Sequence, residues 1–165
     1  KQGIVRWYIA KVKPRTENKI IKYLNQLGIE NFQPLQPDGQ PLLPCFLFVR
    51  TTREKAIDIP KESGLTMEFQ YDPATHQLQY IPEKDMENFI FINRHSNQLI
   101  VLPEPEKLTG GEHVRVIGGE FAGIEGEIYR IKGPKRVIVR LGRDLAVAAG
   151  SYIAKENIEK IEISN

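Results

Sequence analysis

The first hundred residues carry both strand-like and helix-like hydrophobic patterns. Residues 6–12 (RWYIAKV) have the composition of a strand that ends before Lys13-Pro14. A helix is predicted next, because an N-cap residue, three apolar residues at helical spacing and a glycine stop follow in order: Thr16, Ile20, Leu24, Leu27 and Gly28.

Short strands and one further helix fill the rest of this half. Strands are predicted at 32–35 and 46–49, with turn residues at 37–41 between them, and the runs 66–71 and 77–81 around Asp72-Pro73 indicate a hairpin. Pro82 opens a helix with acidic residues in its first turn and one apolar face: Glu83, Asp85, Met86, Phe89 and Ile90. This order of elements favours an α+β sandwich with one helical layer.

The second half has a purely strand-like pattern. Short apolar runs at 113–117, 126–131, 136–141 and 145–149 are separated by glycine turns, and nine of the 13 glycines lie after residue 100. Many short strands with glycine turns are typical of a small all-β barrel. In the third run, alternation points three residues inward (Val137, Val139, Leu141) and two outward (Arg136, Arg140).

A Pro/Glu-rich stretch separates the two patterns. Residues 102–109 (LPEPEKLT) favour extended backbone and cannot continue a helix. We therefore predict a first domain at 1–100, a linker at 101–109 and a second domain at 110–165.

Composition and charge exclude several classes of protein. The 165 residues are 41% hydrophobic, which is typical of a globular chain, and the net charge of +2 is too small to indicate nucleic-acid binding by itself. The single cysteine, Cys45, excludes a disulfide scaffold and is compatible with a cytoplasmic location. No run is long enough for a membrane helix.

The sequence also lacks the usual signs of catalysis. Its three histidines (His76, His95, His113) have no metal-ligand spacing, and no phosphate-binding loop, dinucleotide fingerprint or nucleophile motif occurs. We expect no metal, cofactor or catalytic residue, and an enzyme is the weak hypothesis.

Two motifs resemble the NusG family of transcription elongation factors. The first is Trp7-Tyr8 followed by residues 41–49 (PLLPCFLFV), similar to the "PLFPGYVFV" strand of the family, with Cys45-Phe46 in place of Gly-Tyr and Leu43 in place of Phe. The second, residues 111–128 (GEHVRVIGGEFAGIEGEI), closely resembles a KOW motif. Residues 64–89 and 130–133 also resemble the UpxY-type antiterminators, specialised NusG paralogues related in role to RfaH.

The resemblance implies a fold and a polymerase-binding face. The expected fold is a NusG-like N-terminal domain, a ferredoxin-like α/β sandwich, followed by an SH3-like KOW barrel. Such N-terminal domains dock an apolar face on the clamp helices of RNA polymerase, and the candidate anchors are Tyr8, Leu43, Phe46 and Phe48. Alternation puts Phe46 and Phe48 on one face of their strand and Leu47 and Val49 on the other, and one of these faces must be core. Phe46 is expected to face the partner, whereas Phe48 either faces the partner or packs in the core.

The KOW segment implies protein partners. Phe121, Ile124, Leu141, Gly142 and Arg143 match positions at which NusG-type KOW domains meet a ribosomal small-subunit protein or Rho. The same segment carries six basic residues without an acid: Arg130, Lys132, Lys135, Arg136, Arg140 and Arg143. These either grip RNA phosphates or form a solvated face.

A second basic group lies near the N-terminus. Lys11, Lys13, Arg15 and Lys19 either touch the non-template DNA strand or upstream duplex through phosphates, or serve solubility alone. Taken together, the sequence predicts a monomeric bacterial elongation factor that acts as a processive antiterminator without being an enzyme. The alternative is a ribosome-associated or RNA-binding KOW protein.

Overall fold

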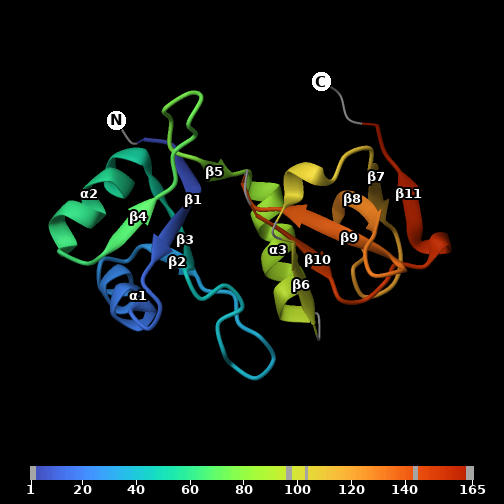
Figure 1. The fold of residues 1–165 in the computed structure, drawn as a ribbon, viewed down its shortest axis with the longest axis horizontal. Helices are drawn as coiled ribbons and strands as arrows, with labels where there is room; N and C mark the ends of the chain where they lie inside the picture. The colour runs from blue at the N-terminus through green and yellow to red at the C-terminus, as the bar shows by residue number, and fades with distance from the viewer. Residues whose placement is uncertain (1–2, 96–97, 103, 143–144, 163–165) are drawn as a thin grey trace. The chain divides into compact units, whose positions relative to one another are not determined.

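The computed structural model describes residues 3–95, 98–102, 104–142 and 145–162. Within these residues it contains three α-helices and two antiparallel sheets, which confirms a mixed α/β fold of the α+β type (Figure 1). The contacts within the chain divide it into two compact units, Lys1–Glu83 and Lys84–Asn165.

The first unit is built on a five-stranded sheet. Its strands are β1 (Val5–Val12), β2 (Glu30–Phe32), β3 (Phe46–Thr52), β4 (Met67–Phe69) and β5 (Tyr80–Ile81). The order is β2-β3-β1-β4, and β5 also pairs with β1. The predicted hairpin is present, since Tyr71 and Leu78 form an antiparallel β-bridge. Its two strands, β4 and β5, then separate and pair with different parts of β1: Met67 lies opposite Val12, and Ile81 lies opposite Trp7. The strand predicted at 32–35 instead ends at Phe32.

Two helices pack on one face of this sheet. The helix α1 (Glu17–Gln26) begins after Thr16 and is followed by Gly28 with φ +70°, as the pattern predicts. The Thr16 side chain does not cap it, because its hydroxyl donates to the Lys13 carbonyl at 2.7 Å. The helix α2 (Arg53–Ser63) was not predicted from the sequence, although Thr52 caps it by accepting a hydrogen bond from the Lys55 amide at 3.3 Å. Both helices lie on the same side of β1, β3 and β4 in Figure 1. Their side chains join sheet residues in one core cluster: Ile20, Leu24, Ala56 and Ile59 with Tyr8, Ala10, Val12, Leu47, Val49, Met67, Phe69 and Leu78.

The second unit is built on a six-stranded antiparallel sheet. Its strands are β6 (Leu99–Leu102), β7 (Glu112–Val116), β8 (Glu125–Arg130), β9 (Lys135–Arg140), β10 (Ala146–Ala149) and β11 (Ile158–Lys160), in the order β11-β7-β8-β9-β10-β6. The helix α3 (Glu83–His95) and two 3₁₀ helices, η1 (Pro105–Lys107) and η2 (Lys155–Asn157), complete it. The strands predicted from 113 to 149 are all present.

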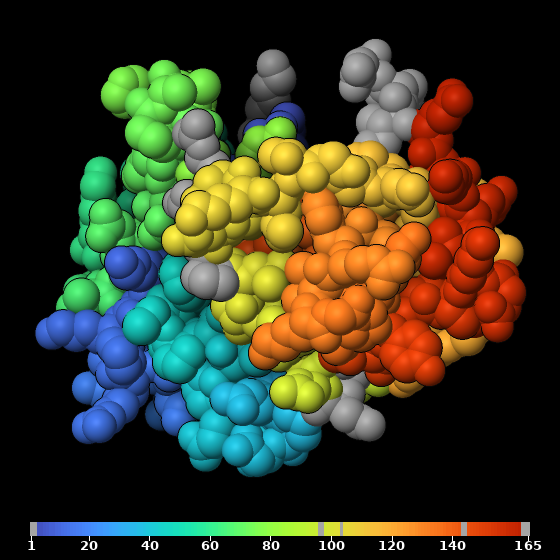
Figure 2. Space-filling view, turned by 45° about the vertical axis from the view of Figure 1, so that its right-hand side comes forward, coloured from blue at the N-terminus to red at the C-terminus, as the bar shows by residue number. Residues whose placement is uncertain are grey.

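The described part of the predicted linker, 101–109, belongs to this second unit. Residues 99–102 form β6, an apolar edge strand whose backbone pairs with β10. The Arg140 guanidinium then holds the next turn, donating at 2.8 Å to the Pro105 carbonyl and at 2.8 Å to the Leu108 carbonyl. In Figure 2 this yellow segment lies against the orange surface of β8 and β9. The two units therefore divide after Glu83, not in the Pro/Glu stretch.

Candidate functional site

The register of β1 and β3 sorts the predicted polymerase-binding residues onto two faces. Lys11 pairs with Phe46 and Ile9 pairs with Phe48, so these side chains share the face opposite the helices. Phe46 and Phe48 therefore lie on one face, as alternation predicts. Phe46 is half-buried, whereas Phe48 is fully buried at 0% exposure.

Tyr8 lies on the other face and does not join them. It pairs with Val49, belongs to the core cluster and is 2% exposed. Its ring meets the edge of Phe69 at 6.4 Å between centroids. Burial raises the pKa of the Tyr8 hydroxyl, an effect that the charges of Arg6 and Arg53 reduce. Grouping Tyr8 with Phe46 and Phe48 was therefore wrong, because one step along a strand reverses the face.

Leu43 is buried as well. It precedes β3 in a tight turn in which the Phe46 amide donates to the Leu43 carbonyl at 3.0 Å. Of the four predicted anchors, Phe46 alone leaves part of its side chain exposed. The register places Lys11, itself exposed, directly beside it.

The other three N-terminal basic residues are exposed but lie away from this pair along the chain. Lys13 and Arg15 follow β1 in the turn before α1, and Lys19 is on α1. Arg15 has φ +73°, in the left-handed region that a residue with a side chain adopts at a cost. Within the part of the chain that the structure describes, none of Lys11, Lys13, Arg15 and Lys19 forms an ion pair, so their charge is available to an anionic partner.

In the second unit, three of the predicted partner-binding residues are buried. Phe121 is 2% exposed, and Ile124 and Leu141 are also buried. Gly142 is half-buried with φ +78°, and Arg143 lies outside the described residues. The Phe121 ring meets Phe91 of α3 edge to face, with 6.5 Å between the ring centroids.

An ion pair at the centre of the second sheet joins β8 and β9. Arg140 Nε donates to Glu127 Oε2 at 2.6 Å and Nη2 donates to Oε1 at 3.1 Å. The Tyr129 hydroxyl donates to the same carboxylate at 3.1 Å and accepts from the Gly111 amide at 3.1 Å. Burial alone would raise the pKa of Glu127, but the hydrogen bond and charge of Arg140 outweigh it and lower this pKa.

A cavity of about 320 Å³ lies between the start of α3 and the sheet. Its lining is Lys84, Asp85, His113, Glu125, Gly126, Glu127, Ile138, Val139, Arg140 and Ile161. Burial raises the pKa of Asp85, and the negative charge of Glu127 raises it further. Since Glu125 pairs with Arg115 at 2.7 Å and Glu127 pairs with Arg140, these two carboxylates are already neutralised within the unit.

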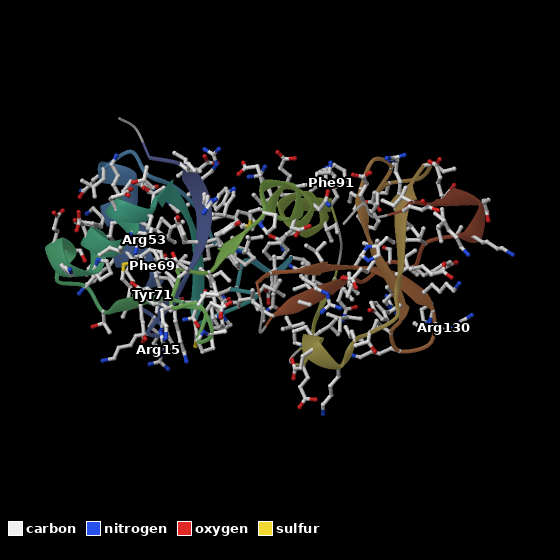
Figure 3. All side chains as sticks on the ribbon, turned by 90° about the horizontal axis from the view of Figure 1, so that it is seen from above. Arg15, Arg53, Phe69, Tyr71, Phe91 and Arg130 are labelled. Carbon is white, nitrogen blue, oxygen red and sulfur yellow. The ribbon has the colours of Figure 1, made fainter. Side chains whose placement is uncertain are left out.

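Half of the predicted basic run is engaged with the protein itself. Arg136 donates to the carbonyls of Ile131, Ala149 and Gly150, and Arg140 is bound as described. Arg130 reaches the Gly133 carbonyl at 3.3 Å from an exposed position at the far tip of the hairpin in Figure 3. Lys132 and Lys135 remain as exposed cations without a hydrogen bond or ion pair in the described chain. A continuous basic strand face for RNA is therefore absent from the described residues.

The described residues hold no cluster of histidine, cysteine or acidic side chains that could bind a metal ion. None of their helices is long and apolar enough to cross a membrane. Known protein families and curated proteins were both compared with this chain, and neither comparison found a match.

Proposed function

We propose that this protein is a NusG-type transcription elongation factor that acts as a processive antiterminator in the cytoplasm of a bacterium. The first unit corresponds in this proposal to a NusG-like N-terminal domain, and the strands from 112 to 160 to an SH3-like KOW barrel. The resemblance of residues 41–49 and 111–128 is its starting point. The proposal needs no catalytic residue, metal or cofactor.

The observation that carries the proposal is the pairing of Phe46 with Lys11. A half-buried aromatic ring beside an exposed cation, on paired strands of a sheet, fits an acidic amphipathic helix such as a polymerase clamp helix. Leu43 and Phe48 are buried, so in this proposal neither of them touches the helix. Bridging the clamp in this way disfavours the open, paused polymerase.

The second unit recruits protein partners in this proposal. The arginines at 136 and 140 favour that role over RNA binding, because their donors are used by backbone carbonyls and by Glu127. The RNA-binding alternative is left with few free cations, and unspecific phosphate contact is the most they support. A ribosomal small-subunit protein or Rho is the expected partner.

The proposal is tested by substituting Phe46→Asp in the full chain. Placing a carboxylate in an apolar helix contact costs several kcal/mol, so polymerase binding is expected to fall by two orders of magnitude or more. Tyr152→Asp is the matched control, because Tyr152 is an exposed aromatic of the second unit (69%). Affinity is measured by titration with RNA polymerase, and read-through by reconstituted transcription. Normal binding and read-through by a folded Phe46→Asp chain would refute the proposal.

A further inference from the structure

The tip of the hairpin formed by β8 and β9 displays three cations close together. Arg130 lies directly opposite Lys135 in the strand register, and Lys132 lies in the turn between them. All three of these tip cations are exposed, and within the described residues none of them forms an ion pair. Figure 3 shows Arg130 at this tip. Like charges that face each other across a strand pair repel, so an anion bound here would relieve an unfavourable interaction.

The backbone of the tip is held by hydrogen bonds at its base. The Ile131 amide donates to the Pro134 carbonyl at 3.0 Å, and Arg136 Nε donates to the Ile131 carbonyl at 2.9 Å. The Ile153 amide donates to the Lys135 carbonyl at 3.2 Å, so the segment after β10 lies against the same strand. Because the fold fixes this backbone, binding a partner at the tip would require little ordering of the chain.

The turn itself does not account for a lysine at position 132. Lys132 has φ +53° and Gly133 has φ +106°, so both residues lie in the left-handed region. This region favours glycine and asparagine and is adopted by a lysine at a cost. A glycine or an asparagine would therefore make the same turn with less strain, but without the charge.

The segments beside the tip contain no acidic side chain that could neutralise it. Neither residues 128–142 nor residues 149–153, which lie next to the hairpin base, include an aspartate or a glutamate. Cations on the strands elsewhere in the unit pair with glutamates: Arg115 with Glu125, Arg140 with Glu127, and Lys160 with Glu112. The positive charge of the tip is therefore left for a partner.

The small extent of the tip favours a short acidic peptide segment over a nucleic-acid strand. Binding of single-stranded RNA uses a row of cations that follows the phosphate backbone. The arginines that would continue the row along β9, Arg136 and Arg140, donate to backbone carbonyls and to Glu127 instead. Three cations at one turn match two or three carboxylates, which a guanidinium can bind through two hydrogen bonds and an ammonium as a point charge.

We propose that Arg130, Lys132 and Lys135 form a docking site for an acidic segment of a protein partner. The segment carries several aspartates or glutamates in succession and lies across the end of the hairpin. The inference deepens the recruitment of protein partners by the second unit and rests on that proposed function for the role of the partner. The site itself is defined by the residues of this chain.

The test measures fluorescence anisotropy of a labelled peptide with four consecutive glutamates, added to the full chain at about 50 mM salt. The matched peptide with four glutamines is the second probe. We expect the glutamate peptide to bind at least tenfold more tightly, since three exposed charge pairs of modest strength together give about that factor. The preference should largely disappear at about 1 M salt, where the charges are screened.

A triple variant locates the binding site. Arg130→Gln, Lys132→Gln and Lys135→Gln together should weaken binding of the glutamate peptide about tenfold. The matched control removes three exposed lysines of α1 and α2 (Lys22→Gln, Lys55→Gln, Lys61→Gln), so it changes the net charge equally and should keep most of the binding. Thermal melting checks the fold, and removal of the facing like charges is expected to leave it intact. If the triple variant melts early, Lys132→Gln alone should still give about a twofold loss.

Three outcomes would overturn the proposal. Equal binding of the two peptides would show that the tip does not select carboxylates. Equal losses in the tip variant and in the control variant would show that net charge alone attracts the peptide. Tighter binding of a short oligouridine than of the glutamate peptide, lost in the tip variant, would assign the tip to nucleic acid.

Failure of this inference is distinguishable from failure of the proposed function, because the peptide assay contains no polymerase. Loss of polymerase binding by Phe46→Asp, with no selective binding of the glutamate peptide, rejects the docking site alone. Selective peptide binding at the tip, with normal polymerase binding by Phe46→Asp, rejects the polymerase-binding proposal alone.

Discussion

Arg140 and Glu127 form the most highly connected ion pair in the described chain, with two hydrogen bonds of 2.6 and 3.1 Å between β9 and β8. The same guanidinium reaches past the sheet to the Pro105 and Leu108 carbonyls. The Arg140 side chain thus connects the segment that contains Pro105 and Leu108 to strands β8 and β9. Removing it would leave a carboxylate and two carbonyls without these donors.

We expect Arg140→Ala to lower the free energy of unfolding of the second unit by roughly 1–3 kcal/mol, since the side chain is one-third exposed and its charged hydrogen bonds are partly screened. Urea unfolding followed by circular dichroism measures the change. Lys132→Ala is the control, because Lys132 is exposed, and it should stay within about 0.5 kcal/mol. Equal stability of Arg140→Ala and Lys132→Ala would contradict the assigned role.

Asp85 makes the second unit sensitive to pH in a defined direction. Its pKa is raised above 3.8 by burial and by the charge of Glu127, so folding favours its protonated form. This contribution to stability is complete below the ordinary pKa and is lost as the pH rises through the raised value. Asp85→Asn should therefore gain stability relative to wild type above that value, with the difference disappearing in more acidic solution.

The measurement is urea unfolding of both chains across the acidic range. The difference in unfolding free energy between the two chains separates the effect of Asp85 from that of Glu127. The pKa of Glu127 is lowered, so its contribution to stability is lost as the pH falls, and both chains contain this residue. The neighbouring charges that face Asp85 are Lys84, His113, Glu125 and Arg140, and they too are common to both chains. A difference between the two chains that does not vary with pH would disprove the predicted protonation of Asp85.

The boundary of the second unit gives a third prediction. A fragment of residues 84–165 retains α3, the pairing of β6 with β10 and both carbonyl partners of Arg140. A fragment of residues 110–165 loses all three. We expect both to give a β-type circular dichroism spectrum, with the shorter one melting at least 10 °C lower, because several interactions of about 1 kcal/mol each are removed from a small unit. Identical melting temperatures would place the boundary near residue 110.

Much of this architecture follows from the sequence, and the exceptions have physical causes. The helix α1 and strands β7 to β10 were predicted because caps, glycine stops and alternation agree locally. The helix α2 was missed because Pro60 lies inside it and only Ala56 and Ile59 are buried, too few to mark a stripe. The cap at Thr52 and the left-handed Gly64 were the signals that could have found it.

The candidate sites were predicted less well than the fold. Alternation separates the two faces of β3 but does not say which face is covered, so it left both a partner contact and core packing open for Phe48, which is buried. Phe121 is buried and contacts Phe91 on a helix thirty residues earlier in the chain, a long-range contact that local patterns do not encode. Likewise, Arg136 and Arg140 resemble solvent-facing strand cations until their carbonyl partners are known.

The last prediction separates partner recruitment from RNA binding by the second unit. Between residues 130 and 142 the cations free to neutralise phosphates are few, mainly Lys132 and Lys135, so RNA binding through this run should be weak, with a dissociation constant of about 10⁻⁴–10⁻⁶ M at physiological salt. Replacing Lys132 and Lys135 together by alanine should reduce the salt dependence of RNA binding by about two phosphate contacts. Fluorescence anisotropy with a short single-stranded RNA between about 50 and 200 mM salt measures both quantities. Tight RNA binding that Arg136→Ala weakens would assign the unit to RNA, because such binding requires an arginine that this structure engages elsewhere.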